Sequence, residues 1–196
     1  MCRRTPQVQS GTTLVEVLVA MVILAIGLLG LVGLQGRIHL LQMESYQRAQ
    51  ALMLLHDMAS RIALNRNDAA SYVTTALGAG MTCPTTNATR QQADASEWFA
   101  ALQGAGETFG GTNVGAMIGG RGCVQRLSAA PGAGVNPNPG EYLVTVAWQG
   151  LGPVSAPPVG VTCGANLYGD AGTPCAGDVC RRVVTTVVRI GNLATT

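Results

Sequence analysis

Hydrophobic and polar residues are distributed unevenly along this chain. Residues 17–34 form a run of eighteen positions without a charged or polar side chain. At about 1.5 Å per residue, a helix of this length spans roughly 27 Å, close to the thickness of a bilayer's hydrocarbon core. The pattern therefore predicts a membrane-spanning helix near the N-terminus.

The helical periodicity continues beyond Gly36. A stripe of mostly apolar or small residues recurs at spacings of three and four, and polar side chains occupy the other faces. The stripe consists of Ile38, Leu41, Ser45, Arg48, Leu52, Leu55, Ala59 and Ile62. We therefore expect one helix from about Thr13 to about Leu64, roughly 80 Å long. Such a length is typical of a spanning or filament helix rather than a globular one.

The remainder of the chain predicts a small α+β domain. Residues 68–81 form a link. The spacing of Asp94 and Glu97 resembles a capping box, followed by a short helix over 95–103 whose Trp98 and Leu102 should contact a sheet. Residues 104–122 are glycine-rich and predict a loop. The expected strands are 123–127, 141–149 and 182–190. Antiparallel pairing of these strands, covered on the apolar face by the long helix, gives an α+β architecture.

Catalytic and metal-binding patterns are not evident in the sequence. His39 and His56 lie 17 residues apart on the long helix, and no serine–histidine–aspartate set, paired carboxylates, H-E-x-x-H motif or phosphate loop is present. Three C-terminal cysteines lack zinc-ligand spacing and a histidine partner. We therefore expect a protein that is not an enzyme and that binds no metal or cofactor.

The N-terminus carries a recognisable combination of features. Residues 1–11 form a short basic leader that ends in Gly11, and Glu16 lies five residues later, at the start of the apolar segment. This combination resembles the class III signal of type IV prepilins and pseudopilins. In that family a membrane peptidase cuts after the glycine and methylates the new N-terminus. The resemblance implies cleavage between Gly11 and Thr12 and methylation of Thr12, which stands where the family usually has phenylalanine.

Glu16 has a further role in this interpretation. A carboxylate near an apolar segment is costly unless it has a partner. In the pilin family that partner is the cleaved N-terminus of a neighbouring subunit. A plain single-span anchor fits the length and the basic flank but gives no role to Gly11 or Glu16. A secretory signal has a shorter apolar core, of about 7–15 residues.

Cleavage would also change the charge balance. All 12 basic residues are arginine, and loss of Arg3 and Arg4 would leave 10 basic and 10 acidic residues. A near-zero net charge argues against nucleic acid as the primary partner, because no basic stripe would neutralise phosphates.

Gly27, Gly30, Gly33 and Gly36 recur at every third position of the long helix. Each glycine costs about 1 kcal/mol of helix propensity relative to alanine. Two interpretations stay open: close packing between helices, or a segment that unwinds when the subunit enters a filament, as is common in pilins.

Five of the six cysteines follow the apolar segment, on the side that the positive-inside rule places outside the cytoplasm, and Cys2 lies in the leader. Disulfides are therefore expected, with one cysteine left over. We expect the pairs Cys163–Cys180 and Cys83–Cys123, with Cys175 as the free thiol, although Cys163–Cys175 stays an alternative. In pilins a disulfide-bounded C-terminal loop often forms a contact region, so 163–180 is either a recognition loop or a structural staple.

The head sequence narrows the resemblance. The segments ALNRNDAA, YLVTVAWQG and CRRVVTTVVRI, together with the Trp98 helix, are similar to the PilV-type minor pilins, also called type IV pilus modification proteins. The resemblance implies a leader (1–11), a membrane and filament-core segment (12–36), an amphipathic helix (37–66) and a periplasmic or extracellular α+β head (67–196).

The same resemblance implies a function. Such a subunit is anchored in the inner membrane by a single span and is processed by prepilin peptidase/methyltransferase. It helps other minor pilins and the major pilin to begin assembly of the extracellular pilus, with positions at the tip and along the shaft both open. A minor pseudopilin of a type II secretion system is the first alternative. A single-span envelope protein that binds ligands and never polymerises is the second.

Overall fold

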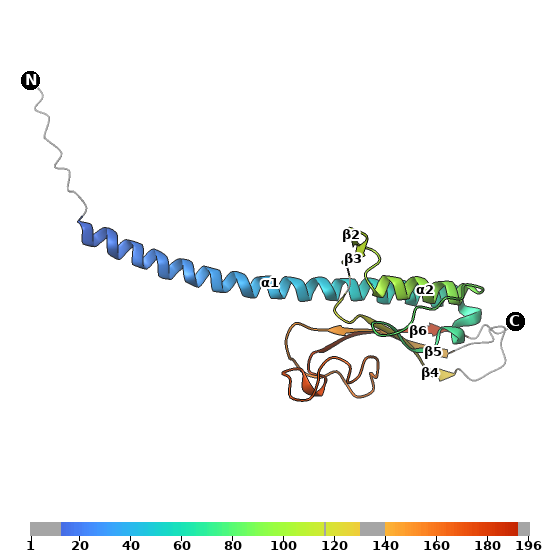
Figure 1. Ribbon diagram of the computed structural model, residues 1–196. Coiled ribbons are helices and arrows are strands. Elements are labelled where there is room, and N and C mark those ends of the chain that lie inside the picture. The colour runs from blue at the N-terminus through green and yellow to red at the C-terminus, as the bar shows by residue number, and fades with distance from the viewer. Residues whose placement is uncertain (1–12, 116, 130–139, 192–196) are drawn as a thin grey trace, which may run out of the picture. The chain divides into compact units, whose positions relative to one another are not determined.

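The structure, a computed structural model, describes residues 13–115, 117–129 and 140–191. Two units can be distinguished: the N-terminal part of helix α1 up to Met43, and a head that begins at Glu44. Figure 1 shows their elements. The candidate cleavage residues Gly11 and Thr12 lie outside the described residues, as does Cys2.

Helix α1 (Leu14–Leu64) is continuous over 51 residues, which confirms the long helix expected from the hydrophobic pattern. It is followed by the 3₁₀ segment η1 (Arg66–Tyr72), strand β1 (Thr74–Gly78) and helix α2 (Arg90–Leu102). The remaining elements are β2 (Thr108–Phe109), β3 (Thr112–Asn113), β4 (Arg121–Ala129), β5 (Gly140–Gln149), η2 (Ala176–Asp178) and β6 (Arg181–Ile190).

Four strands form one antiparallel sheet in the order β1-β4-β5-β6, and β2 and β3 form a separate two-stranded hairpin. The three strands expected from the sequence are confirmed as β4, β5 and β6. Strand β1 and the small hairpin lie in segments expected to be a link and a loop. Both are short, and Thr74–Gly78 lacks the run of alternating hydrophobic residues that marks a strand.

The main core lies between the sheet and the two helices, which pack on the same face (Figure 1). Along the head part of α1 the buried stripe is Gln47, Ala51, Leu55, Met58 and Ile62. From β5 the core receives Tyr142, Val144, Val146 and Trp148. The helix, the sheet and the disulfides confirm the α+β, pilin-like fold class.

The stripe expected on α1 was partly wrong. Leu55 and Ile62 are buried, but Leu52 and Arg48 are exposed, and the neighbouring Ala51 is fully buried instead. Most positions of this helix are apolar, so periodicity alone cannot choose between adjacent stripes. Packing against the sheet decides between them, and it buries Ala51 and Met58 beside Leu55 and Ile62.

Helix α2 begins one turn earlier than expected, and the capping box is formed by other residues. Thr89 is the N-cap: its hydroxyl accepts from the backbone N–H of Gln92, and the Gln92 side chain accepts in return from the backbone N–H of Thr89. The expected box at Asp94 and Glu97 was wrong, because Asp94 lies within the helix and is buried.

The expected contact of Trp98 with the sheet is confirmed. Trp98 is fully buried, and its indole N–H donates to the carbonyl oxygen of Leu54 at 3.0 Å. Its ring lies directly over Gly122 of β4, where any Cβ would overlap the ring. The indole therefore joins α1, α2 and the sheet.

Candidate functional site

Glu16 lies in the first turn of α1, and Thr13 accepts from its backbone N–H. The backbone N–H of Glu16 donates to the carbonyl oxygen of Thr13 at 3.0 Å and lies 3.4 Å from its hydroxyl oxygen. A carboxylate in the first helical turn interacts favourably with the helix dipole. Glu16 is exposed, and its carboxylate has no hydrogen-bond or ion-pair partner among the residues that the structure describes.

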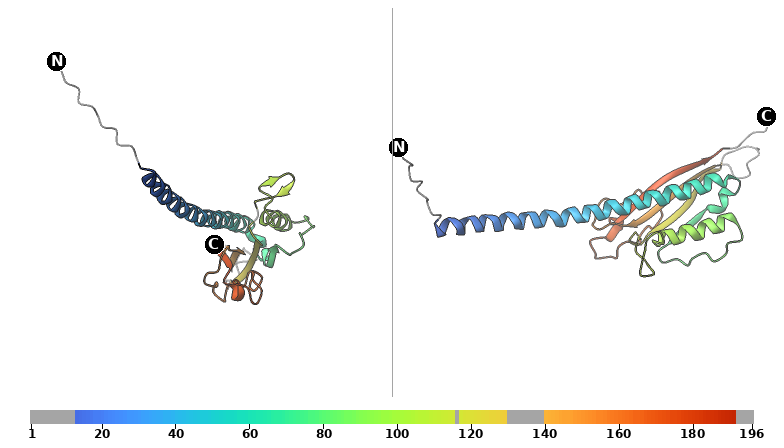
Figure 2. Two further views of the ribbon diagram at one scale, coloured as in Figure 1. Left: turned by 60° about the vertical axis from the view of Figure 1, so that its left-hand side comes forward. Right: turned by 90° about the horizontal axis from the view of Figure 1, so that it is seen from above.

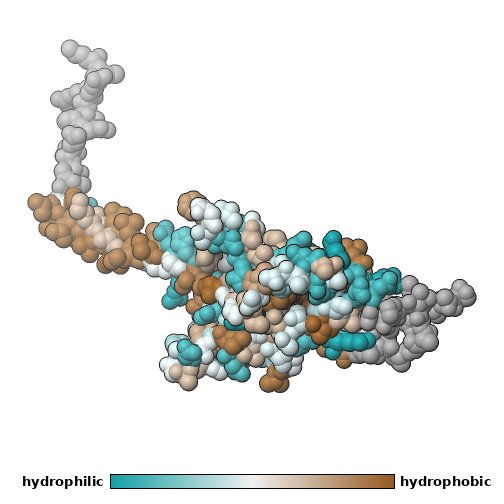
Figure 3. Space-filling model, turned by 45° about the vertical axis from the view of Figure 1, so that its right-hand side comes forward, coloured by the Kyte–Doolittle hydropathy of each residue, from teal (hydrophilic) through white to brown (hydrophobic). Residues whose placement is uncertain are grey.

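The N-terminal part of α1 presents apolar side chains in every direction. It contains a window long and apolar enough to cross a membrane, none of which is buried within the chain. Figure 3 shows this segment as uniformly hydrophobic, in contrast to the mixed surface of the head. A helix that is hydrophobic all round needs an apolar environment or other helices around it.

The four glycines of this segment are not required by contacts within the chain. A Cβ at Gly27, Gly30, Gly33 or Gly36 would meet nothing within 4 Å, and α1 stays helical through all four. Packing between subunits and unwinding therefore both stay predictions.

The disulfides in the head differ from the expected pairs. The bridges are Cys123–Cys163 and Cys175–Cys180, and Cys83 is free and exposed. The expected pairs Cys83–Cys123 and Cys163–Cys180 were wrong, as was the assignment of Cys175 as the free thiol. The alternative pair Cys163–Cys175 was also wrong.

Strand alternation explains why Cys123 does not reach Cys83. Gly122 faces Trp98 of α2, so the next residue of β4, Cys123, points to the opposite face of the sheet, where it packs with Cys163. Cys83 lies beside Ser96 of α2, on the helix side. Cys180 instead bonds to Cys175 because a sharp turn through η2, with Gly177 and Asp178 both at positive φ, folds the chain back.

The loop between β5 and β6 is fastened to the sheet by polar contacts as well. Arg181 is buried and donates to the carbonyl oxygens of Val161 (2.7 Å) and Cys163 (3.0 Å) and to the carboxylate of Asp178 (3.0 Å). Asp178 also accepts from the backbone N–H of Asn166 at 2.8 Å. One buried guanidinium thus holds three points of the loop.

Tyr168 provides a second anchor for the same loop. Its hydroxyl donates to the carbonyl oxygen of Gly119 at 2.8 Å, and Arg121 lies over its ring. Burial raises the pKa of Tyr168 to about 12. With its base fixed in this way, the loop exposes the apolar side chains of Val154, Val159 and Leu167, of which Val159 is 98% exposed. This arrangement suits a contact region, and recognition through 163–180 stays a prediction.

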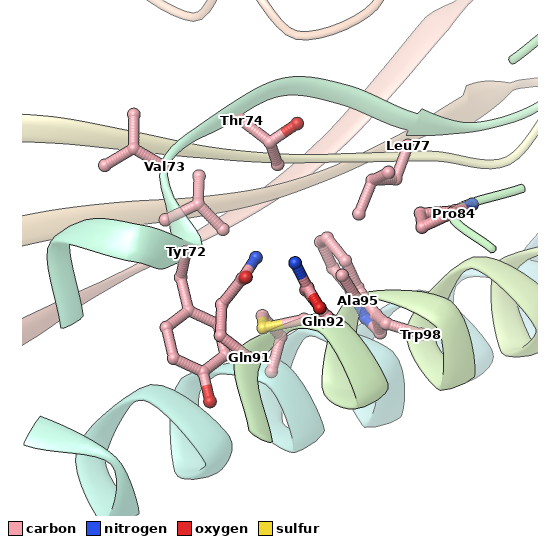
Figure 4. A pocket seen from close by; sticks show the side chains of 11 residues that line it. Tyr72, Val73, Thr74, Leu77, Pro84, Gln91, Gln92, Ala95 and Trp98 are labelled. Carbon is pink, nitrogen blue, oxygen red and sulfur yellow. The ribbon is translucent and has the colours of Figure 1, made fainter. Parts of the chain in front are cut away.

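A small cavity of about 200 Å³ lies between β1 and α2. Figure 4 shows the Gln91 and Gln92 side chains pointing into the space between Tyr72 and Trp98. The floor is formed by buried side chains of Met58, Ala95, Trp98 and Val124. Among the residues the structure describes, no group of three or more metal-ligating side chains is present here or elsewhere.

Comparison with known proteins gives one match. Residues 7–32 match the family described as the prokaryotic N-terminal methylation motif. The match spans the candidate cleavage residues, Glu16 and most of the apolar run. No curated protein and no solved structure matches the chain.

This motif supports a protein of the type IV pilin or pseudopilin class. The motif implies processing by a prepilin peptidase, and together with the apolar helix it indicates a membrane-anchored precursor. Sequence reasoning located this segment and Glu16, but it did not find the Arg181 and Tyr168 anchors of the head loop, for which the sequence carries no local signal.

Proposed function

We propose that this protein is a PilV-type minor pilin, a low-abundance subunit that helps other minor pilins and the major pilin to begin assembly of a type IV pilus. The observation that carries this proposal is the methylation motif at residues 7–32, which leads directly into the continuous helix α1. The similarity of the head segments to PilV-type proteins supports the choice of subgroup.

In the proposed mechanism the precursor spans the inner membrane once, with its leader in the cytoplasm. Prepilin peptidase cuts between Gly11 and Thr12 and methylates Thr12. The disulfides form outside the cytoplasm and fix the head. Glu16 then pairs with the new N-terminus of a neighbouring subunit, which removes two unpaired charges from an apolar environment. The subunit acts through packing and charge pairs and carries out no catalysis.

A minor pseudopilin of a type II secretion system is the second candidate, because the same motif serves both systems. Deletion of the gene distinguishes these two candidates: loss of pili would favour the minor pilin, and loss of type II secretion would favour the pseudopilin. A single-span envelope protein that binds ligands without polymerising is the third candidate. It predicts no role for the carboxylate of Glu16 in assembly.

The processing test is the intact mass and N-terminal sequence of membrane-extracted protein, with and without prepilin peptidase. A peptidase-dependent start at Thr12 is expected, with the added mass of one methyl group. A chain that begins at Met1 in both samples would exclude processing.

The assembly test compares Glu16→Gln with Glu16→Asp. The first variant keeps the shape and removes the charge, so it should abolish incorporation into filaments. The second variant keeps the charge and should retain part of the incorporation into filaments. Equal incorporation of Glu16→Gln and the unmodified chain would show that the Glu16 charge-pair mechanism is wrong, whereas absence of the unmodified chain from filaments would favour the non-polymerising candidate.

A further inference from the structure

Strand β6 forms one margin of the sheet, on the side away from β1 and α2 (Figure 2). Its ten residues pair with β5 in unbroken register. On its outer side, no described residue offers a backbone hydrogen-bond partner to residues 183–190. Because alternate residues of an antiparallel strand direct their N–H and C=O groups to opposite sides, β6 presents on its outer side a row of donors and acceptors that no residue in the described ranges pairs.

The sequence of this edge has none of the usual protection against pairing. Residues 183–188 read VVTTVV, all β-branched and uncharged, without proline, glycine or a bulge. Natural edge strands are usually short, bulged, covered or charged. The flanking charges are already engaged within the chain: Arg182 binds Glu44 at 2.6 Å and Arg189 binds Glu141 at 2.8 Å.

The opposite edge of the sheet is protected. Strand β1 has only five residues, its register with β4 shifts between Thr74 and Leu77, and it lies against α2. The two edges of one sheet are therefore unequal, and only β6 is suited to accept a strand.

We propose that the β6 edge is a docking site for an extended strand of a different pilin-class subunit, which pairs antiparallel to β6 and adds a fifth strand to the sheet. An unpaired row of backbone groups is complementary only to another extended backbone. Small or β-branched uncharged side chains of the partner fit best beside VVTTVV. This inference rests on the proposed assembly function.

The direction of β6 excludes a second copy as the preferred partner. Figure 2 shows β6 alongside the head part of α1, and both run toward the same end of the head, so β6 has the same sense as Glu44–Leu64. The contact of Arg182, at the start of β6, with Glu44 agrees with this direction.

Pilin-class subunits anchored in one membrane share this orientation. A second copy could therefore offer only a parallel β6, which pairs less stably, or its own short and bulged β1. The partner strand must run opposite in direction to β6, as an antiparallel edge strand of another subunit would. This chain would then stand at one end of a lateral series of heads.

The first test uses the full-length chain in detergent with a synthetic peptide of residues 182–189 as a strand probe. Amide exchange should slow in β6 and stay unchanged in β1. A control peptide N-methylated at both central threonines lacks one N–H donor on each of its two edges. It should therefore leave amide exchange in β6 unchanged. Equal protection by the two peptides, or none in β6, would overturn the open-edge assignment.

Val187→Lys provides the matched variant, because lysine on an edge opposes strand pairing and should weaken peptide binding about tenfold or more. Val187 is 42% exposed, so the fold should tolerate the change. The control is Val159→Lys on the head loop, which should bind the peptide like the unmodified chain. Equal weakening by both variants would show a nonspecific charge effect and contradict the proposal.

The second test identifies the partner in the producing cells. A photoreactive leucine analogue at position 187 should cross-link to a different chain that carries its own N-terminal methylation motif, and the same residue at 159 should not.

Proline substitutions test whether the cross-link depends on the outer edge of β6. Of Thr185→Pro and Thr186→Pro, one removes an N–H that binds β5 and should lower Tm. The other removes an N–H that faces away from β5, on the outer edge. The variant that keeps its Tm should lose the cross-link.

Three outcomes would overturn the proposal: cross-links only to a second copy, no cross-link at 187, or equal cross-linking at 159. The result for Glu16→Gln separates the two hypotheses. If that variant fails to assemble while position 187 gives no cross-link, the edge inference is wrong and the proposed function stands. If Glu16→Gln assembles normally, the Glu16 charge-pair mechanism of the proposed function is wrong as well, and if the unmodified chain never enters filaments, the proposed function itself is wrong.

Discussion

The guanidinium of Arg61 on α1 donates to the carboxylate of Asp94 on α2, with 2.8 Å between Nη1 and Oδ1. Asp94 is almost completely buried and also accepts from the hydroxyl of Tyr72 and from Arg90. A buried carboxylate is tolerated only with such partners. This cluster joins the last turns of α1, the segment η1 and α2, so it fixes the end of the head at which α1 stops.

Replacement of Asp94 should destabilise the head strongly. Asp94→Ala leaves Arg61 and Tyr72 without their buried partner, and we expect the free energy of unfolding to fall by about 3 kcal/mol. Denaturant titration measures the change. The control is Glu97→Ala, which removes another partner of Arg61 whose side chain is 64% exposed. That variant should lose about 0.5 kcal/mol or less. Equal losses would show that burial of Asp94 is not the cause.

The close approach of Trp98 to β4 depends on a glycine. In Gly122→Ala the new methyl group would overlap the indole ring, so either the ring or the strand must move. Overpacking of this kind costs about 1–3 kcal/mol. The matched control is Gly106→Ala, where a Cβ meets nothing within 4 Å. Similar melting temperatures for the two variants would contradict the described packing.

The two disulfides should contribute unequally to stability. Cys123–Cys163 closes a loop with a sequence separation of 40, and Cys175–Cys180 one of only 5. In the chain-entropy account, removing the first bridge by a double Cys→Ala change costs about 4 kcal/mol and removing the second about 2 kcal/mol. Thermal unfolding of the two double variants checks the order.

Alkylation under non-reducing conditions checks the pairing itself. After removal of the leader, only Cys83 should react, because it is the exposed free thiol of the described head. Alkylation at Cys175 would instead support the pairing expected from the sequence.

Tyr72 and Tyr168 of the head should ionise at unusually high pH. Burial raises the pKa of Tyr168 to about 12, and burial together with the hydrogen bond to Asp94 raises the pKa of Tyr72 to about 12. Phenolate absorbance should therefore show that Tyr72 and Tyr168 ionise well above the ordinary value near 10. Tyr168→Phe should remove one of these late steps and leave the other.

The same shifts predict the alkaline limit of stability. A raised pKa in the folded state means that the neutral phenol is favoured by folding. The resulting stability is complete below pH 10 and is lost as the pH rises from about 10 through about 12. Tm should fall less steeply over this range in Tyr168→Phe. An identical alkaline profile in the variant would show that Tyr168 is not involved.

The sequence by itself determined the features that depend on local pattern. The apolar run of residues 17–34 and the helical periodicity that continues beyond Gly36 predicted the extent of α1, because a helix satisfies its own backbone and leaves a local pattern in the sequence. Alternation of β-branched and aromatic residues located β4, β5 and β6. The spacing of Gly11, Glu16 and the apolar run pointed to the class of protein, since a processing signal is read along the chain.

Tertiary structure alone decided the features that depend on which face a side chain meets. The stripe on α1 shifted to include Ala51 and Met58 because packing against the sheet, and not periodicity, chose between adjacent faces of the helix. Cys123 paired with Cys163 because strand alternation turned it away from Cys83. Asp94 became a buried partner of Arg61 rather than a helix cap, and β6 became an open edge only through the order of the strands. Each of these outcomes depends on contacts between residues far apart in the chain, which periodicity and spacing do not encode.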